Sequence, residues 1–300
     1  MKNKIVISRI LLIIVGIVFI ISAIAKLLSI DSFEIYIYSF GFFNLNISFI
    51  IARLLIGFEL VLGICLALSV FPKQMSYLAI ASLVGFTCFL AYLLISKKEE
   101  HCHCFGNMIE LSHTMSIIKN LILCGLLIPG ILLPFKNIWY HKILVGIIFT
   151  AGLVTPFVYS TPDNLIKHES NASYQQVYLD EFLNENPHLT QGRKVVSFIG
   201  TGCKFCKLAS RKLTVISNKA NNFSDVFYVV WGTEETLNHF FEETHSYHFN
   251  NTLLPARIFI RITNGQMPLI LLLENGKVIK KYDYRELNEK EIISFLSPNK

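Results

Sequence analysis

The stretch that decides the fold of the C-terminal half is "KVVSFIGTGCKFCKLASRKLTVISNKA", residues 194–220. It opens with "VVSFIG", a short β-branched and aromatic run that is typical of a buried strand. Thr201 and Gly202 then turn the chain, and apolar residues recur at helical spacing from Cys206 onward, with lysines on the other face. The stretch therefore predicts a strand, a turn and a helix, with Cys203 and Cys206 placed where the helix begins.

Strands and helices go on alternating after this stretch. A strand, a helix, a hairpin and a final helix are predicted, in that order, from "VFYVVW" (226–231), "TEETLNHFFEE" (233–243), "PLILLLENGKVIKKYDY" (268–284) and "ELNEKEIISFL" (286–296). Thr233 is a plausible cap for the first of these helices, and Asn275-Gly276 is a hairpin signal. Such an order predicts an α/β sandwich.

The Cys203-Lys-Phe-Cys206 motif lies at the junction between the strand and the helix. A helix N-terminus carries partial positive charge and stabilises a thiolate, and Lys204 adds to that field. We therefore expect Cys203 to be the exposed nucleophile and Cys206, one turn further on, to be the resolving thiol. The alternative is half of a zinc site, which would need a second ligand pair. The nearest candidates, His245 and His248, are expected on a solvated loop.

These features resemble the thioredoxin family over about residues 192–298: a strand, a CxxC motif at a helix start and a later "MPLILLLENGKVI". The resemblance implies dithiol chemistry. It also implies that Met267-Pro268 is the cis-proline that packs against the CxxC motif and helps to seat a partner peptide. Two features depart from the family pattern: Gly202 replaces a common tryptophan, and Lys-Phe replaces Gly-Pro between the cysteines. They leave the redox potential open.

The N-terminal half is a series of apolar segments. A helix that spans a bilayer needs about 20 apolar residues, and five segments come close to that length: residues 6–29, 47–71, 76–96, 116–135 and 143–160. The first segment is too long for a signal peptide, and further apolar residues follow it instead of a cleavage site. We expect it to be retained as a helix.

Basic residues set the expected orientation. They precede the first span or lie in the turns after the second and fourth spans: Lys2, Lys4, Arg9, Lys73, Lys136 and Lys142. The positive-inside rule places such residues in the cytoplasm, so we expect a cytoplasmic N-terminus. Five crossings would place the C-terminal half and the 97–115 loop outside the cytoplasmic membrane of a bacterium. The net charge is +6, with no basic patch among aromatic residues, so nucleic acid is excluded as a partner.

The outer loop contains "HCHCFG", residues 101–106. A disulfide between Cys102 and Cys104 would close a small ring, with Cα atoms near the upper limit of about 6.8 Å. Such a strained bond is oxidising and suits a site that accepts electrons from another dithiol. His101 and His103 can lower a thiolate pKa or shuttle protons. Two alternatives stay open: a Cu(I) or Zn(II) site made by these four residues, and two inert loop cysteines.

The segments "RILLIIVGIVFIISAIAKLL" (9–28), "GFELVLGICLAL" (57–68) and "CHCFG" (102–106) resemble the DoxX/MauE membrane family over about residues 5–135. The resemblance implies a four-helix bundle over residues 1–135, with a role in disulfide handling or quinone-linked redox chemistry. Residues 136–160 would then add a fifth span and residues 161–191 a linker. The thioredoxin-like domain would occupy residues 192–300.

Glu59 is the one acidic residue deep in a predicted span. An ionisable group at this depth is a functional candidate by default, so Glu59 is expected to transfer protons or to pair with a basic group. Lys26 and Arg53 lie nearer the outer interface and are expected to snorkel towards it. Three cysteines within the spans are expected to be packing residues: Cys65, Cys88 and Cys124.

Together these observations predict a membrane-bound thiol–disulfide oxidoreductase. Cys203 and Cys206 would exchange with extracytoplasmic protein thiols and then with Cys102 and Cys104. The helical bundle would pass electrons to or from a membrane carrier, a quinone, with no tightly bound cofactor. The alternative is a membrane metal-binding or assembly module, in which the HCHC residues hold copper or zinc and the attached domain keeps them reduced. The expected partners are the lipid bilayer and extracytoplasmic thiol or disulfide proteins.

Overall fold

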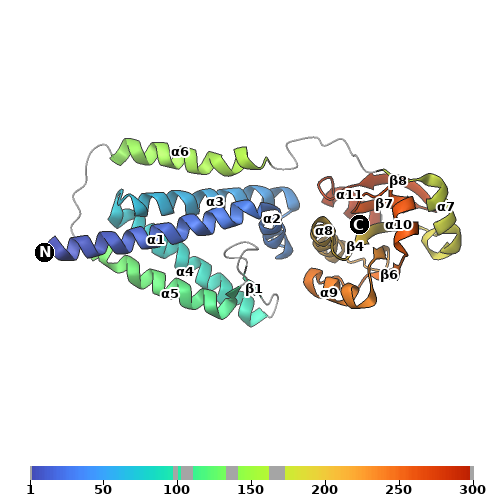
Figure 1. The fold of residues 1–300 in the computed structure, drawn as a ribbon, viewed down its shortest axis with the longest axis horizontal. Coiled ribbons are helices and arrows are strands. Elements are labelled where there is room, and N and C mark those ends of the chain that lie inside the picture. The colour runs from blue at the N-terminus through green and yellow to red at the C-terminus, as the bar shows by residue number, and fades with distance from the viewer. Residues whose placement is uncertain (1, 97–100, 103–110, 133–140, 162–172, 298–300) are drawn as a thin grey trace. The chain divides into compact units, whose positions relative to one another are not determined.

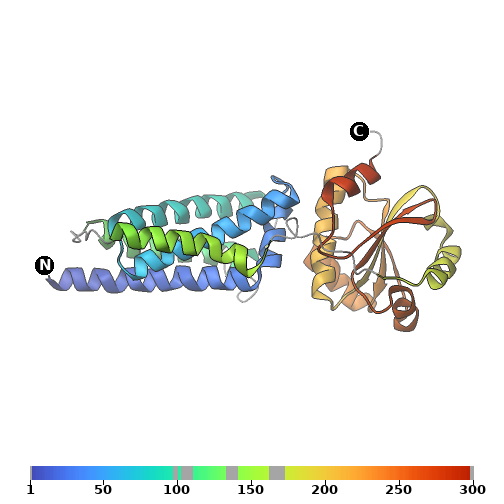
Figure 2. The same ribbon diagram turned by 90° about the horizontal axis from the view of Figure 1, so that it is seen from above.

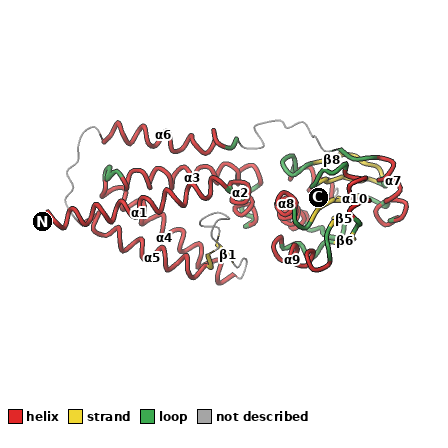
Figure 3. Tube along the Cα trace, in the orientation of Figure 1, coloured by secondary structure: helices red, strands yellow, loops and turns green. Residues whose placement is uncertain are grey.

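The structure, a computed structural model, describes residues 2–96, 101–102, 111–132, 141–161 and 173–297. It divides into two compact units, one of residues 1–36 and 49–162 and the other of residues 37–48 and 163–300. Figure 3 shows that the N-terminal part is almost wholly helical and that nearly all the strands lie in the C-terminal part. Each unit is a fold of its own.

The described residues of the N-terminal part form six helices, and Figures 1 and 2 show α1, α3, α4 and α5 running along one another. Their bounds are α1 Lys2–Leu28, α2 Ile30–Ser39, α3 Leu45–Ala67, α4 Pro72–Ser96, α5 His113–Leu132 and α6 His141–Tyr159. Within the described residues, four of these helices (α1, α3, α4 and α5) are long and apolar enough to cross a bilayer. The predicted fifth span corresponds to a shorter apolar helix, Ile143–Tyr159. The chain is thus a multi-pass membrane protein.

Close packing between α1 and α3 depends on two glycines. A Cβ atom on Gly16 would lie 2.6 Å from the Gly63 carbonyl oxygen, and one on Gly63 would lie 2.9 Å from the Gly16 oxygen. Small residues let membrane helices approach closely, which replaces the hydrophobic driving force that lipid does not supply. Around this crossing, a buried cluster joins α1 and α3 to α4 and α5, and it includes Leu12, Leu62, Leu83 and Leu127.

Helix α2 was not predicted. Its sequence, "IDSFEIYIYS", has 10 residues and contains acidic and hydroxyl side chains, so it is far too short to be recognised as a span. Ile35 is nevertheless fully buried, and Glu34 is almost fully buried. The helix therefore belongs to the packed interior of the protein.

The C-terminal part contains a five-stranded sheet in the order β6-β5-β4-β7-β8. The strands are β4 Arg193–Gly200, β5 Val226–Trp231, β6 Asn250–Leu253, β7 Leu269–Glu274 and β8 Lys277–Tyr282. β5 runs parallel to both β4 and β6, whereas β7 runs antiparallel to β4 and β8. Asn275 and Gly276 both have positive φ, 50° and 76°, as a two-residue hairpin turn requires. The predicted hairpin is confirmed.

Helices cover both faces of this sheet (Figure 1). On one face lie α8 Lys204–Ala220, α9 Glu234–Thr244 and α11 Glu289–Leu296, and on the other lie α7 Gln176–Glu185 and α10 Ala256–Thr263. The predicted α/β sandwich is confirmed, and so is the Thr233 cap, which forms a capping box with Thr236.

Helices α7 and α10, strand β6 and the short 3-10 helix Pro187–Leu189 were not predicted. Helix α7 lies within residues 161–191, which were expected to be an irregular linker. Its Leu179, Phe182 and Leu183 pack into the same core as Phe198 of β4. The expectation is wrong for residues 176–185, where Leu179, Phe182 and Leu183 recur at the i, i+3, i+4 spacing of one helix face.

Candidate active site

The CxxC motif lies at the end of the central strand, where β4 stops at Gly200 and α8 begins. Cys203 is the N-cap of α8, and its Sγ accepts a hydrogen bond from the Cys206 N–H at 3.2 Å. The Gly200 N–H donates to Cys206 Sγ at 3.4 Å. Both cysteines are free thiols; Cys203 is partly exposed, whereas Cys206 is 0% exposed. A partner sulfur can therefore reach Cys203 before Cys206.

The surroundings move the pKa values of the two thiols in opposite directions. A hydrogen bond from the Cys206 thiol is the main cause that lowers the pKa of Cys203 to about 6, and the backbone N–H groups of Cys206 and Phe205 add to it against the effect of burial. Burial is the main cause that raises the pKa of Cys206, and the neighbouring Cys203 raises it further. Lys204, which was expected to contribute, is not among the groups that lower the pKa of Cys203.

Met267 and Pro268 face the reactive thiol. The peptide bond between them is cis, as the resemblance to thioredoxins implied. The Cys203 Sγ lies 3.9 Å from the Met267 carbonyl oxygen, a long contact for a thiol donor. Gly200 makes room for this arrangement, since a Cβ atom there would lie 2.9 Å from Met267 Sδ.

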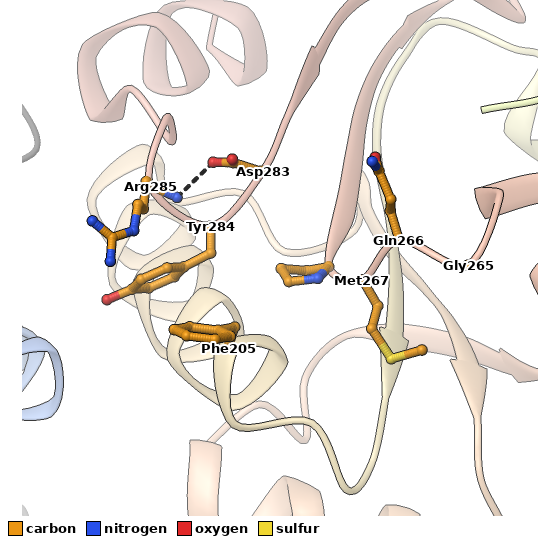
Figure 4. A pocket seen from close by; sticks show the side chains of 8 residues that line it. Phe205, Gly265, Gln266, Met267, Asp283, Tyr284 and Arg285 are labelled. Atoms are coloured by element: carbon orange, nitrogen blue, oxygen red, sulfur yellow. Dashed lines mark hydrogen bonds between the residues drawn. The ribbon is translucent and has the colours of Figure 1, made fainter. Parts of the chain in front are cut away.

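A pocket of about 390 Å³ opens beside Pro268 (Figure 4). Its walls combine aromatic, apolar and charged side chains: Phe205, Gly265, Gln266, Met267, Pro268, Asp283, Tyr284 and Arg285. Phe205 stands between the two cysteines in sequence and is 43% exposed. The sequence indicated Pro268 as part of the site. It gave no signal for residues 283–285, which follow β8 and line the pocket only because of the tertiary fold.

In the membrane part, Glu59 forms an ion pair with Lys26. The Lys26 Nζ lies 2.7 Å from both carboxylate oxygens of Glu59 and donates to Ser22 Oγ at 2.8 Å. Ser22 in turn donates to Glu59 at 3.2 Å. Lys26 is only 5% exposed, so the expectation that it snorkels to the interface is wrong. The opposite charge on Glu59 holds it inside the bundle.

Arg53 is also buried, at 2% exposed, and forms an ion pair with Glu34 of α2. It donates at 2.8 Å to two carbonyl oxygens, that of Phe49 in its own helix and that of Ser160 just beyond α6. Snorkelling was therefore the wrong expectation here too. The partner was missed because Glu34 lies outside every predicted span.

The HCHC motif lies only partly within the described residues. His101 and Cys102 form the short strand β1, which pairs antiparallel with β3, Leu111–Ser112. His103 and Cys104 lie outside the described residues, so the reactive CxC pair and its metal-binding alternative both stay predictions. Within the described part of the chain, no group of three or more His, Cys, Asp or Glu side chains could hold a metal ion.

The remaining candidates differ in burial, and the expectation that Cys88 is a packing residue is wrong because Cys88 is exposed. His245 and His248 are exposed, as expected of a solvated loop, and the His248 ring packs against Phe223. Cys65 is a free thiol that packs in a buried cluster with Val61 and Ile148.

The N-terminal part is similar to a known family of membrane proteins. Residues 4–133 match the family model described as "Methylamine utilisation protein MauE". The resemblance predicted for it is confirmed as far as MauE, and the DoxX half of that resemblance stays a prediction. Protein TlpB of Flavobacterium psychrophilum is 26% identical over 292 aligned residues, which cover 77% of this chain and 78% of the relative.

Several solved structures resemble the C-terminal part, and each covers 37% of this chain. The thioredoxin domain of a thiol-disulfide oxidoreductase from Bacteroides vulgatus is 23% identical, with a TM-score of 0.31 and 83% of that chain covered. A thiol:disulfide interchange protein from Bacteroides sp. is 22% identical, with a TM-score of 0.31 and 75% covered. The chain therefore combines a membrane part that matches the MauE model with a C-terminal α/β domain that carries a CxxC motif and a cis-proline.

Proposed function

We propose that this protein is a membrane-bound thiol–disulfide oxidoreductase whose reactive dithiol is Cys203 and Cys206. The observation that carries the proposal is the contrast between the two thiols. Cys203 is accessible and its pKa is lowered to about 6, so it is mostly thiolate at neutral pH, and the thiolate is the nucleophile in disulfide exchange. Cys206 is buried and its pKa is raised, so it stays protonated until a partner has bound.

The exchange proceeds in two balanced steps. The Cys203 thiolate attacks one sulfur of a partner disulfide, so that a mixed disulfide forms and the other partner sulfur leaves as a thiolate. Cys206 then gives up its proton and attacks Cys203 Sγ, which closes the Cys203–Cys206 disulfide and releases the second partner thiolate. The partner gains two electrons and this dithiol loses two. The reverse sequence oxidises a partner dithiol.

We further propose that Cys102 and Cys104 receive electrons from Cys203 and Cys206 and pass them to a quinone. Two electrons and two protons convert a quinone into a quinol, which balances the oxidation of one dithiol. The MauE match includes the CxC motif, and a disulfide in so small a ring is a strong electron acceptor. Glu59 and His103 are the proposed proton carriers, because each can gain and lose a proton.

The proposed location is the cytoplasmic membrane of a bacterium, with the N-terminus inside and the thioredoxin-like domain outside. The charge distribution along the sequence supports this orientation. Helix α6 supports the fifth crossing that it requires: its 19 residues extend about 28 Å at 1.5 Å per residue, close to the hydrocarbon thickness of about 30 Å. Proteins outside the cytoplasm can hold stable disulfides, so the proposed partners are extracytoplasmic thiol proteins.

The test is turnover by the purified full chain in detergent. A reduced model protein and a soluble quinone analogue are supplied, and quinol and protein disulfide are measured together. We expect them to form in equal amounts. Cys203→Ala should abolish both products, whereas Cys65→Ala, the same substitution at a buried packing thiol, should abolish neither.

The same assay also tests the proposed electron transfer from Cys203 and Cys206 through Cys102 and Cys104 to the quinone. Cys102→Ala should stop quinol formation but leave a single round of substrate oxidation by an oxidised Cys203–Cys206 pair. Quinol formation by Cys203→Ala at the wild-type rate would refute the role of Cys203. Stoichiometric copper in the purified protein without thiol turnover would instead support the metal-binding alternative.

A further inference from the structure

A lysine lies in the core of the thioredoxin-like domain. Lys212 of α8 is 0% exposed. Burying an ammonium group is costly unless its protons find acceptors. Lys212 contacts Tyr284 in two ways. Its Nζ donates to the Tyr284 carbonyl oxygen at 3.0 Å and lies 4.0 Å from the centroid of the Tyr284 ring. The charge thus holds both the backbone and the side chain of Tyr284.

Tyr284 links this buried charge to the pocket. It lies in the segment between β8 and α11 and is itself buried, yet it lines the pocket beside Pro268. Its ring centroid is 5.6 Å from that of Phe205, with 37° between the ring planes, and Figure 4 shows the two rings one above the other. Phe205 stands between Cys203 and Cys206 in the sequence, and its backbone N–H donates to the Cys203 sulfur, so these contacts lead to a residue that adjoins the reactive thiol.

A second anchor holds the same segment on its other side. The Asp283 Oδ1 accepts the N–H groups of Arg285 at 2.7 Å and Glu286 at 3.0 Å. This local turn fixes the backbone that follows Tyr284. The position of the Tyr284 ring, however, depends on the group that contacts its face, and that group is the Lys212 ammonium.

We propose that Lys212 is a positioning residue for the partner polypeptide, because it holds Tyr284 against Phe205 as the aromatic wall of the pocket beside Pro268. The inference rests on the proposed exchange at Cys203. Two aromatic rings and Pro268 offer an apolar surface, so the part of the partner that uses it is an apolar side chain next to the reacting cysteine. Lys212 touches no reacting atom and acts through Tyr284.

The chemistry of the contact explains why a lysine ammonium, and not an apolar side chain, can hold Tyr284 in place. A cation over a ring face is attracted to the π electrons, and an ammonium N–H can bond a carbonyl at the same time. An apolar side chain of equal length would fill the space but would hold neither group in place. Methionine is close to lysine in length and volume and buries no charge, so the Lys212→Met variant should fold.

The test compares two disulfides as substrates of the full chain in detergent, with reduced glutathione supplied to return the Cys203–Cys206 disulfide to the dithiol after each turnover and with the rate without protein subtracted. One is a peptide disulfide with leucine beside the half-cystine, and the other is hydroxyethyl disulfide, which is too small to occupy the pocket while it reacts. For Lys212→Met we expect KM for the peptide to rise about tenfold, with the rate for the small disulfide and the pH profile of Cys203 alkylation unchanged. Lys194→Met is the matched control, since Lys194 pairs with Asp225 near the far end of β4, and it should change neither substrate.

A double-mutant cycle separates positioning from general damage. Tyr284→Leu should raise the peptide KM selectively, and adding Lys212→Met to it should cause no further loss. Equal losses for both disulfides in Lys212→Met, or additive losses in the double variant, would overturn the proposal. A wild-type protein that reacts with neither disulfide would refute the proposed function itself, which is a different outcome.

Discussion

The lowered pKa of Cys203 should depend on the thiol of Cys206. Cys206→Ala removes the hydrogen bond that contributes most to lowering the pKa of Cys203, while the backbone N–H groups of Cys206 and Phe205 stay in place. In the wild type, Cys203 should react as a thiolate down to a pH of about 6 and lose reactivity as the pH falls through that value. The variant should lose reactivity at a higher pH.

The size of the change follows from the energy of one hydrogen bond. A hydrogen bond to a charged group contributes about 1.5–3 kcal/mol, and about 1.4 kcal/mol corresponds to one pH unit in the midpoint of a titration. The midpoint for Cys203 should therefore move from about 6 to between about 7 and 8. The two backbone donors should keep it below the reference thiol pKa of about 8.5.

The assay is alkylation by iodoacetamide at a series of pH values. The full chain is reduced and labelled briefly, and mass spectrometry of its peptides gives the fraction of Cys203 modified. Peptide resolution matters because the chain has seven cysteines. Cys65→Ala is the matched control, and it should leave the Cys203 profile unchanged.

Two results would refute the reasoning. A wild-type midpoint near the reference thiol value would mean that the thiolate is not stabilised at this helix start. An unchanged midpoint in Cys206→Ala would mean that the backbone donors alone lower the pKa, and that the Cys206 thiol does not assist the nucleophile.

Three further predictions concern the membrane ion pair, a helix cap and the orientation. Glu59→Gln leaves the Lys26 ammonium buried without its counter-charge and should destabilise the membrane domain by about 3 kcal/mol in detergent unfolding, whereas Glu59→Gln with Lys26→Met should recover most of that loss. Thr233→Ala removes the capping box of α9 and should cost about 1 kcal/mol in chemical denaturation, with no change in the Cys203 alkylation profile. A membrane-impermeant maleimide should label Cys203 in intact, reduced spheroplasts, and labelling only after lysis would reverse the proposed orientation.

Much of the thioredoxin-like domain could be predicted because its signals are local. Cys203 and Cys206 follow a buried strand and open a helix, Thr233 caps the next helix, and Asn275-Gly276 suits a two-residue hairpin turn. Each of these is a short pattern with one dominant physical explanation. The order of the two thiols could be predicted from their position at a helix N-terminus, which favours an anion, whereas the main cause of the lowered Cys203 pKa, the hydrogen bond from the Cys206 thiol, emerged only from the structure.

What the sequence did not reveal depends on contacts between distant segments. Lys26 and Glu59 are 33 positions apart, and only the packing of α1 on α3 brings them within 2.7 Å. Tyr284 comes to lie on Phe205 because β8 ends beside the start of α8, which no local pattern records. Snorkelling was a reasonable expectation for an isolated helix, but the half-buried carboxylate of Glu59 is a better partner for Lys26.

The central claim is that Cys203 attacks and Cys206 resolves, and trapping the mixed disulfide tests it most directly. Removing the resolving thiol should stop the exchange after its first step. The full chain carrying Cys206→Ala is isolated from cells after acid quenching, and non-reduced peptides are examined by mass spectrometry. We predict that Cys203 is found joined to another cysteine, including Cys102 or Cys104 of the same chain, and that Cys203→Ala leaves Cys206 unjoined. Finding Cys203 free in the first variant and Cys206 joined in the second would contradict the account.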